Sequence, residues 1–424
     1  MIERIQRALE KEGIELYRIV SCREQRAELY FIKKDLDLPR FADITVCTVE
    51  VFRDFEEDGK RYRGFTNTKI APGTSDEEIG RKVREAYFAA GFVKNPWFEL
   101  PDPVAEEKKG SASDLRGRDL AKVAEAFAEA VFAVPSDEQA FVNSLEIYAE
   151  HTERSIIVSN GLQVSFDEDR VRGEFVAQCR TPVDVEQFRQ FSYDSFDTEA
   201  LQQKIEDGIR DVRLRAAAKS APKNGTCNIL LTGEHVRELL SYYEFRANAS
   251  VIFPHYSDWK IGDHVQQEGT GEALKLTLKA TAPYSSEGIP MKDRVLIEDG
   301  VLKTVHGGTR FCRYLGTEPT GEYRKLLCEN GSMDLHEMRT RGPVLECVSF
   351  SDFQTDFMGG TFGGEMRLSL LHENGSTTPL SGGSVNGRIA DIEGKLIFSK
   401  ERYSDSTYEG PYAVLIPDVP IAGE

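Results

Sequence analysis

The sequence predicts an α+β fold: an N-terminal part with duplicated helix–antiparallel strands–helix units, and a strand-rich, barrel-like C-terminal domain. The order helix, alternating strand-like runs, helix occurs twice before residue 222. The remaining residues are mostly short apolar runs broken by glycine pairs, which is typical of barrels rather than of doubly wound sheets. A length of 424 residues with 40% hydrophobic residues is enough for two to four domains.

The first unit is predicted over residues 1–105. Ile2, Ile5 and Leu9 share one face of a helix over residues 2–12. Three runs with strand-like alternation follow, and an amphipathic helix over Ser75–Phe92 closes the unit. The runs are Glu28–Lys33, Ile44–Phe55 and Arg61–Ile70. Three prolines within residues 95–103 stop any further helix.

The second unit is predicted over residues 106–222 and repeats that order. It opens with a polar linker at Glu106–Ser113, continues with a helix at Leu120–Ala133, and ends with a helix at Thr198–Lys219. Between the helices, Asn160-Gly161 predicts a two-residue hairpin turn. The strands expected here are Ser144–Glu150, Arg154–Ser159, Leu162–Asp167 and Val171–Gln178. Because the order recurs without sequence identity, we infer a duplication from the pattern alone.

The third domain is predicted over residues 223–424. One short helix is expected at Gly233–Phe245, and short strands fill the rest. Glycine pairs interrupt these strands at residues 307–308, 359–360, 363–364 and 382–383. The Gly-x-Gly at 269–271 lacks the other glycines and the following helix of a phosphate-binding loop, so no nucleotide-binding motif is predicted.

Charge and cysteine content exclude several classes of protein. With 53 Lys and Arg against 71 Asp and Glu, the net charge is −18, which disfavours broad binding to nucleic acid or to anionic membranes. The first residues have no apolar segment of a secretory signal, and no stretch reaches the ~18 apolar residues of a membrane span. The seven cysteines include no CxxC pair, so neither a disulfide framework nor a zinc ribbon is indicated. We expect a cytoplasmic, reduced protein.

Metal-binding motifs are incomplete in this sequence. A zincin helix needs two histidines four residues apart, so that both imidazoles share one face. His336-Glu337 is followed by Thr340, His372-Glu373 runs into a turn, and His235-x-x-Glu238 lacks the next histidine. Loop histidines could still meet in space, which leaves His255, His264 and His306 as weak candidates for metal ligands. For His306 we prefer a polar side chain in a strand–turn–strand.

Covalent catalysis has no local motif either. The nucleophile elbow Gly-x-Ser-x-Gly is absent, since the segment starting at Gly382 ends with Asn386 instead of glycine. The carboxylates are too numerous for any pair to stand out. Local motifs alone therefore predict no catalytic residue.

Several segments, taken in order, resemble one family. Residues 292–303 followed by Gly307-Gly308 are similar to its I-x-x-G-x-L strand pair, and residues 373–380 with 382–392 are similar to its E-N-G-x-I-x-x-P-V … I-x-G-N-x-x-D signature. Residues 359–364 fall at its glycine-rich strand, and residues 414–423 resemble the C-terminus of its PmbA (TldE) members. The sequence thus resembles the TldD/PmbA family, often labelled modulators of DNA gyrase, and is closest to the PmbA/TldE-type subunit.

The resemblance implies a division of labour between two chains. TldD-type chains carry HExxxH on a helix and a Cys near the end, and hold a catalytic metal; PmbA/TldE-type chains lack these ligands and pair with them to form a peptidase for unfolded peptides. Here the corresponding helix, residues 234–244, has a single His, and residues 406–410 have no Cys. The resemblance therefore implies that this chain has no catalytic residue and binds no cofactor. It also implies that the chain is inactive without its partner, and that a TldD-like partner holds zinc.

Contacts with a peptide or with the partner are expected at Gly359, Gly360, Gly363, Gly364 and His306. Glycine-rich strands can present backbone groups to an extended peptide, although they equally suit a tight barrel corner. An alternative function is a stand-alone homodimer that binds peptides or proteins without hydrolysis. A third is a self-sufficient peptidase with scattered ligands. No nucleic acid or membrane partner is expected.

Overall fold

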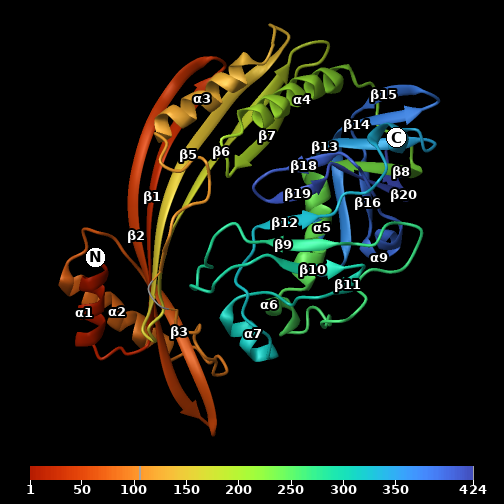
Figure 1. Cartoon of the computed structure of the whole chain (residues 1–424). Helices are drawn as coiled ribbons and strands as arrows, with labels where there is room; N and C mark the ends of the chain where they lie inside the picture. The colour runs from red at the N-terminus through yellow and green to blue at the C-terminus, as the bar shows by residue number, and fades with distance from the viewer. Residues whose placement is uncertain (105–106, 424) are drawn as a thin grey trace.

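The computed structural model describes residues 1–104 and 107–423. It has an N-terminal part built on one large sheet and a C-terminal domain built on two sheets (Figure 1). The helices are α1 Ile2–Lys11, α2 Asp76–Ala90, α3 Leu120–Ala133, α4 Thr198–Ala217, α5 Glu234–Arg246, α6 Ala249–Ile252, α7 Thr309–Leu315, α8 Leu335–Arg339 and α9 Ile389–Ile392. The strands are β1 Tyr17–Ile32, β2 Asp35–Glu57, β3 Lys60–Ile70, β4 Glu107–Lys109, β5 Ala140–Val158, β6 Gln163–Cys179, β7 Val185–Tyr193, β8 Gly225–Thr232, β9 Leu276–Lys279, β10 Arg294–Glu298, β11 Val301–Leu302, β12 Lys325–Cys328, β13 Val344–Asp356, β14 Thr361–Glu373, β15 Ser376–Leu380, β16 Ser384–Arg388, β17 Ile397–Phe398, β18 Arg402–Ser404, β19 Tyr408–Pro411 and β20 Ala413–Ala422.

The duplicated order of elements is confirmed in the N-terminal part. Helix α1, strands β1–β3 and helix α2 form the first copy, and helix α3, strands β5–β7 and helix α4 form the second. Antiparallel pairing of β1 with β5 joins the two copies into one sheet, in the order β3-β2-β1-β5-β6, with β4 and β7 both on β6. Its curled upper part carries α3 and α4 on one side, whereas α1 and α2 lie lower down (Figure 1).

The strands of this sheet are longer than the sequence pattern predicted. The four runs expected between residues 144 and 178 form two strands, β5 and β6, and the first two runs of the first unit extend into β1 and β2. The predicted breaks fall on polar residues that remain in the ladder. In the gap predicted at residues 168–170, Glu168 binds Arg154 and Asp169 binds His151, both on the neighbouring strand β5, at 3.0 and 2.7 Å. Because these charges are paired across the sheet, they do not interrupt it.

Local signals explain several element boundaries. Ser75 and Asp119 cap α2 and α3 by accepting hydrogen bonds from backbone N–H groups of the first turn. The predicted Asn160-Gly161 turn joins β5 to β6, with Gly161 at φ +99°. The predicted linker at Glu106–Ser113 contains a short strand, β4, which pairs with β6. The predicted boundary between residues 105 and 106 lies outside the described residues, and the domain limits stay a prediction.

The C-terminal domain contains the predicted barrel. Strands β13, β8, β20, β16 and β14 follow one another in a sheet that closes through pairing of β13 with β14. A second sheet has the order β11-β10-β9-β12-β19-β18. Helix α5 packs in the core between the two sheets, where Leu239, Leu240 and Tyr243 are buried among residues of both. The barrel-like C-terminal domain is therefore confirmed.

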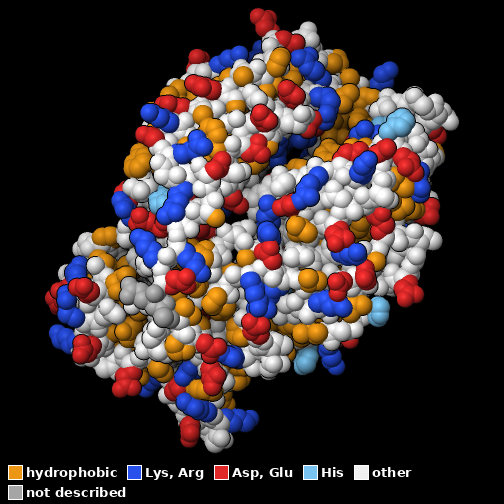
Figure 2. Space-filling model, in the orientation of Figure 1, with side chains coloured by type: hydrophobic (Ala, Val, Ile, Leu, Met, Phe, Trp, Pro, Cys, Tyr) orange, Lys and Arg blue, Asp and Glu red, His pale blue; other side chains and the backbone are white. Residues whose placement is uncertain are grey.

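The two parts of the chain pack together at the lower end of the large sheet. Phe52, Phe98 and Phe166 form a buried cluster there with Tyr284 of the C-terminal domain. Arg18 on β1 bridges Glu50 on β2 and Glu287 of the C-terminal domain, at 2.6 and 3.3 Å. Farther up, the surface is hollowed between the sheet and the C-terminal domain (Figure 2). None of the described helices is both long and apolar enough to cross a membrane.

Candidate functional site

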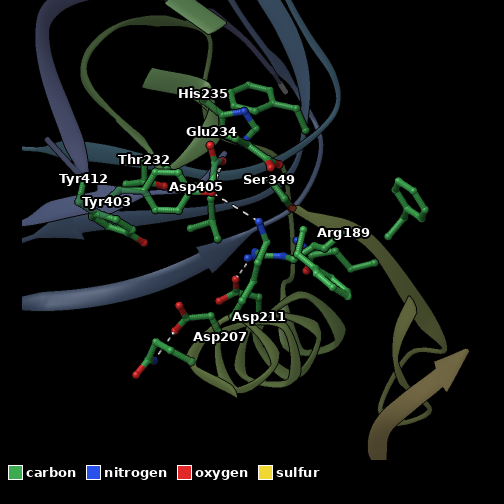
Figure 3. Close-up of a pocket in the computed structure, with 18 of the residues that line it drawn as sticks. Arg189, Asp207, Asp211, Thr232, Glu234, His235, Ser349, Tyr403, Asp405 and Tyr412 are labelled. Carbon is green, nitrogen blue, oxygen red and sulfur yellow. Dashed lines mark hydrogen bonds and ion pairs between the residues drawn. The ribbon is translucent and has the colours of Figure 1, made fainter. Parts of the chain in front are cut away.

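A cavity of about 700 Å³ lies between the N-terminal sheet and the C-terminal domain. Strand β7 and helix α4 form one wall; the start of α5, strand β13 and the segment around β18 form the other. Figure 3 shows side chains from both walls pointing toward each other. The lining is rich in charged and aromatic groups, including Arg189, Lys204, Asp207, Asp211, Glu234, His235, Phe350, Tyr403, Asp405 and Tyr412. An interface between two parts of a chain is a common place for a ligand site.

Lys204 lines this cavity, and no carboxylate of the described residues forms an ion pair with it. Its Nζ donates to the Tyr403 hydroxyl at 3.4 Å, across the gap between the two walls. Burial lowers the pKa of Lys204, while Glu234 and Asp405 act in the opposite direction from farther away. The hydroxyl of Tyr403 in turn donates to Asp405 at 3.0 Å. The lysine therefore keeps donor capacity for a ligand that enters between the walls.

Two arginines on the wall formed by β7 and α4 are fixed by carboxylates, one of them buried. Arg189 on β7 and Arg210 on α4 both bind the buried Asp211, at 2.5 and 2.9 Å. Arg210 also binds Asp207 at 2.6 Å. These bonds tie β7 to α4, so this wall of the cavity is rigid.

The N-terminus of helix α5 faces the same cavity. Its N-cap is Gly233, whose φ of +60° is accessible to glycine, and no side chain caps the first turn. His235 follows, with its ring edge-on to Phe350 and Phe353 at centroid distances of 4.8 and 5.5 Å. Burial lowers the pKa of His235, so its imidazole is neutral at pH 7. The helix thus presents one neutral histidine in an aromatic setting.

Strand β7 presents a partly open edge to the cavity. Its other edge pairs with β6 along its whole length. Arg215 donates to the carbonyl of Glu186, and the N–H of Ser406 donates to the carbonyl of Ser192, so both carbonyls point away from β6. Because alternate residues of a strand direct their backbone groups to the same side, those of Phe188 and Gln190 also point away from β6. Among the described residues they have no backbone partner on that side.

The three histidines proposed as weak metal candidates lie in different settings. His255 and His264 are exposed, and His255 adopts a positive φ of 64°. His306 is buried, and its Nε2 lies 2.8 Å from the carbonyl oxygen of Glu244. Within residues 1–104 and 107–423, no three His, Cys, Asp or Glu side chains are grouped as ligands for a metal ion.

The four predicted contact glycines belong to the barrel. Gly359 and Gly360 form the turn between β13 and β14, with φ +65° at Gly360. Gly363 and Gly364 lie in β14, which pairs with β13 on one side and β16 on the other. A Cβ at Gly364 would stand 2.5 Å from the carbonyl oxygen of Asp352, so glycine is needed for close packing. Both edges of β14 are paired at Gly363 and Gly364, so these two residues offer no free strand edge to a peptide. Other contacts of the four glycines with a peptide or a partner stay a prediction.

Gly363 also lines a second hollow, at an end of the barrel, with Asp356, Asp391 and Asp418.

The residues of the interdomain cavity were not singled out by the sequence pattern. They come from β7, α4, α5, β13 and β18, which are far apart in the chain. Only His235 and Glu234, at the start of the helix that the family resemblance emphasises, carried a signal.

Comparison with known proteins adds the family. Residues 224–423 match the family described as PmbA/TldA metallopeptidase C-terminal domain. No curated protein sequence matches the chain significantly. Among solved structures, TldE from Thermococcus kodakarensis is 17% identical, with a TM-score of 0.76 and complete coverage of both chains. A candidate modulator of a DNA gyrase from Thermotoga maritima is 16% identical, with a TM-score of 0.77 and 99% coverage of both chains.

A candidate modulator of DNA gyrase from Bacteroides thetaiotaomicron is similar too. It is 17% identical, with a TM-score of 0.78, and the alignment covers 100% of this chain and 99% of that one. At such identities the structures establish the shared fold over the whole chain, and the sequence match establishes the C-terminal domain. Residues 224–423 therefore form a C-terminal domain of the PmbA/TldA metallopeptidase family, and over its full length the chain has the fold of TldE.

Proposed function

We propose that this chain is the PmbA/TldE-like subunit of a two-chain metallopeptidase, in which a TldD-like partner provides the metal and this chain provides a wall of the peptide-binding chamber. The observation that carries the proposal is helix α5, at the place where the catalytic chains have HExxxH. It has one histidine, His235, and that side chain packs against Phe350 and Phe353. A catalytic zinc site needs three protein ligands and an open position.

The residues of this chain do not fit the catalytic metal of the family. Glu234 and Glu238 flank His235 on α5, but the N–H of Thr355 already donates to the Glu238 carboxylate at 3.0 Å. In the described part of the chain, no further His or Cys joins them in a group of metal ligands. The proposal therefore assigns no metal-dependent step to this chain.

The part we assign to this chain is to hold an extended peptide. The edge of β7 at Phe188 and Gln190 offers backbone donors and acceptors, which bind a peptide strand without regard to its sequence. Lys204 and the free N–H groups at the start of α5 lie around the same cavity and suit peptide carbonyl or carboxylate oxygens. Such a wall would align an unfolded chain for cleavage by the partner.

The test is reconstitution of peptidase activity. The purified chain is assayed on an unstructured fluorogenic peptide, alone and with an HExxxH-containing TldD-type chain. We expect no cleavage by this chain alone and cleavage by the mixture above the level of the partner alone. Stoichiometric zinc in the isolated chain, lost on replacing His255 or His264, would contradict the proposal.

A binding-only role is the second candidate, and the open edge of β7 favours it as well. In that case, the chain would bind unstructured peptides as a homodimer, with no hydrolysis in any mixture. Peptide binding by fluorescence anisotropy, together with unchanged cleavage when the two chains are mixed, would select this role.

A further inference from the structure

Two arginines line one end of the interdomain cavity, one from helix α4 and one from the barrel. Arg215 lies in the last turn of α4, and Arg367 lies on β14. Met366 and Leu368, on either side of Arg367, are buried in the barrel, so the alternation of the strand directs Arg367 outward. Figure 1 shows the C-terminal end of α4 beside β14 and β15. We name Arg215 and Arg367 the arginine pair.

The charge of Arg215 is not balanced by a carboxylate of the described residues. Its Nη1 donates to the carbonyl oxygen of Glu186 at 2.6 Å, and its Nε is buried without an acceptor. Burial lowers the pKa of Arg215, and the positive charge of Arg367 acts in the same direction. A half-buried cation beside a like charge is unfavourable until an anion joins it. This cost is expected at a site where a ligand provides the opposite charge.

Arg367 has only a weak partner. It lies 3.4 Å from the carboxylate of Glu365, and the two side chains are 43 and 56% exposed. Exposed ion pairs of this kind contribute little to stability, so Arg367 can exchange Glu365 for a ligand at small cost. A guanidinium is a planar fork of N–H donors that matches the two oxygens of a carboxylate. The arginine pair therefore suits a carboxylate that a ligand brings into the cavity.

The open edge of β7 leads to the arginine pair. Glu186, whose carbonyl binds Arg215, is the second residue of β7, and the open positions Phe188 and Gln190 follow it. A peptide that adds antiparallel to this edge has its C-terminal end beside the start of β7. Its terminal carboxylate then lies at the arginine pair, whereas a parallel peptide would bring its positively charged N-terminus there.

The other end of the cavity has more acidic than basic groups around Lys204. Burial lowers the pKa of this lysine, and the nearby carboxylates of Glu234 and Asp405 act against that effect. Lys204 and Arg215 are eleven residues apart on α4, which corresponds to about 16 Å along the helix. An extended segment of about five residues covers the same distance. The arginines and aspartates between the two ends pair with one another, so the ends determine the direction of a bound peptide.

We propose that the arginine pair binds the C-terminal carboxylate of an extended peptide that lies antiparallel along the open edge of β7. This rests on the proposed function, because it requires that the chain holds a peptide, and it adds the substrate class: peptides and protein tails with a free C-terminus. Only the terminal carboxylate and backbone groups are recognised, so the side chains of the peptide are left free to vary. Arg215 and Arg367 thereby fix the direction of the bound peptide.

The experiment measures the binding of labelled peptides to the full-length chain alone, by fluorescence anisotropy. One unstructured pentapeptide has a free C-terminal carboxylate, and a second has the same sequence with a C-terminal amide. We expect the carboxylate form to bind about tenfold or more tightly, because hydrogen bonds between ions are strong. Arg215→Gln and Arg367→Gln should each remove this preference by weakening the carboxylate form alone. Arg213→Gln, on the same helix but in a surface ion pair with Asp137, is the matched control and should keep the preference.

A third peptide separates the two sources of a carboxylate. It is amidated but ends in glutamate, and we expect it to bind like the amide form; binding as tight as that of the free carboxylate would overturn the proposal. So would equal affinity for the carboxylate and amide forms, or a preference that persists in Arg215→Gln and Arg367→Gln.

Circular dichroism and thermal melting establish which variants fold. If Arg215→Gln does not fold, Arg367→Gln decides, because its side chain is 43% exposed. A chain that binds no peptide at all would refute this proposal together with the proposed peptide-holding role. Failure of cleavage with a partner chain would contradict the proposed function and leave the comparison of carboxylate with amide unaffected.

Discussion

Arg18 is the residue whose replacement should separate the two parts of the chain most specifically. Its guanidinium contacts Glu50 at 2.6 Å and Glu287 at 3.3 Å, and these three side chains are between 12 and 18% exposed. Arg18→Met keeps the length of the side chain and removes the charge. Two carboxylates then face each other at the junction between the large sheet and the C-terminal domain. Removing one partner of a buried ion pair costs about 3–5 kcal/mol.

We expect a cost near 3 kcal/mol at pH 7.5, the lower end of that range, because the cluster retains some contact with water. The cost should shrink as the pH falls. Burial raises the pKa of Glu50, and nearby Glu287 adds to this. Burial works in the same direction on Glu287, but Arg18 and the Thr309 donors lower its pKa in the wild type. Without Arg18 both pKa values rise, the folded variant takes up protons, and it gains stability relative to the unfolded chain toward pH 5.

The two tryptophans make a direct assay possible, because Trp97 belongs to the N-terminal part and Trp259 to the C-terminal domain. Urea unfolding is followed in Trp97→Phe and Trp259→Phe backgrounds, each with and without Arg18→Met. We expect coincident transitions with Arg18 and an earlier transition in the N-terminal part without it. Arg18→Met/Glu50→Gln should recover part of the loss. Arg81→Met, at an exposed ion pair on α2, is the control, with a cost below about 1 kcal/mol. Equal costs for Arg18 and Arg81, or a cost that grows toward pH 5, would refute the reasoning.

Three further predictions concern the barrel and the cavity. Gly364→Ala should lower the melting temperature by several degrees, because the added Cβ would collide with the Asp352 carbonyl. The control is Gly80→Ala in helix α2, where the nearest atom to the added Cβ is 3.6 Å away, and it should raise stability by about 0.5–1 kcal/mol in the same thermal assay. Equal shifts in the two variants would contradict the packing argument. Phe188→Pro should weaken the binding of an unstructured peptide by about tenfold or more, because it removes an N–H that points away from β6 toward the cavity. Its melting temperature should change little. Gln187→Pro removes an N–H directed at β6 and should instead destabilise the sheet. Peptide affinity that survives Phe188→Pro would exclude the β7 edge as the binding element. Lys204→Met should stabilise the fold at pH 7, because burial lowers the pKa of Lys204 in the folded state. The wild type should therefore become more stable as the pH rises through that folded-state pKa, and the variant should not. Denaturant unfolding of both proteins between pH 7 and 10 measures this difference.

The fold could be predicted from the sequence where signals are local. The helix at Leu120–Ala133 has the predicted bounds, since Asp119 caps it and its apolar face is continuous. The Asn160-Gly161 hairpin was equally readable. Strand lengths were not predictable, because residues such as Glu168 and Asp169 look like breaks until their partners Arg154 and His151 on the neighbouring strand are known. Joining of the two units through β1 and β5 also had no signal, since a pairing between Arg18 and Val158 is remote in sequence.

The candidate site was less predictable than the fold. The resemblance pointed to α5, and the start of α5 does line the cavity. The other residues of the cavity, such as Arg189, Lys204 and Tyr403, are ordinary in their local sequence and acquire a role by meeting across two parts of the chain. His255, His264 and His306 were weak candidates by residue type alone; the first two are exposed, whereas His306 is buried with its Nε2 beside the carbonyl oxygen of Glu244. Glycines 363 and 364 are explained by strand packing, which a glycine-rich pattern cannot distinguish from binding.

The central claim is that this chain assists a metal-containing partner without a metal centre of its own. The most direct measurement combines metal analysis with peptide cleavage on the same samples: this chain alone, an HExxxH-containing TldD-type chain alone, and the two mixed one to one. The account predicts zinc only with the partner, no cleavage by this chain alone, and increased cleavage in the mixture that Phe188→Pro reduces. Stoichiometric zinc and peptide cleavage in this chain alone would contradict it.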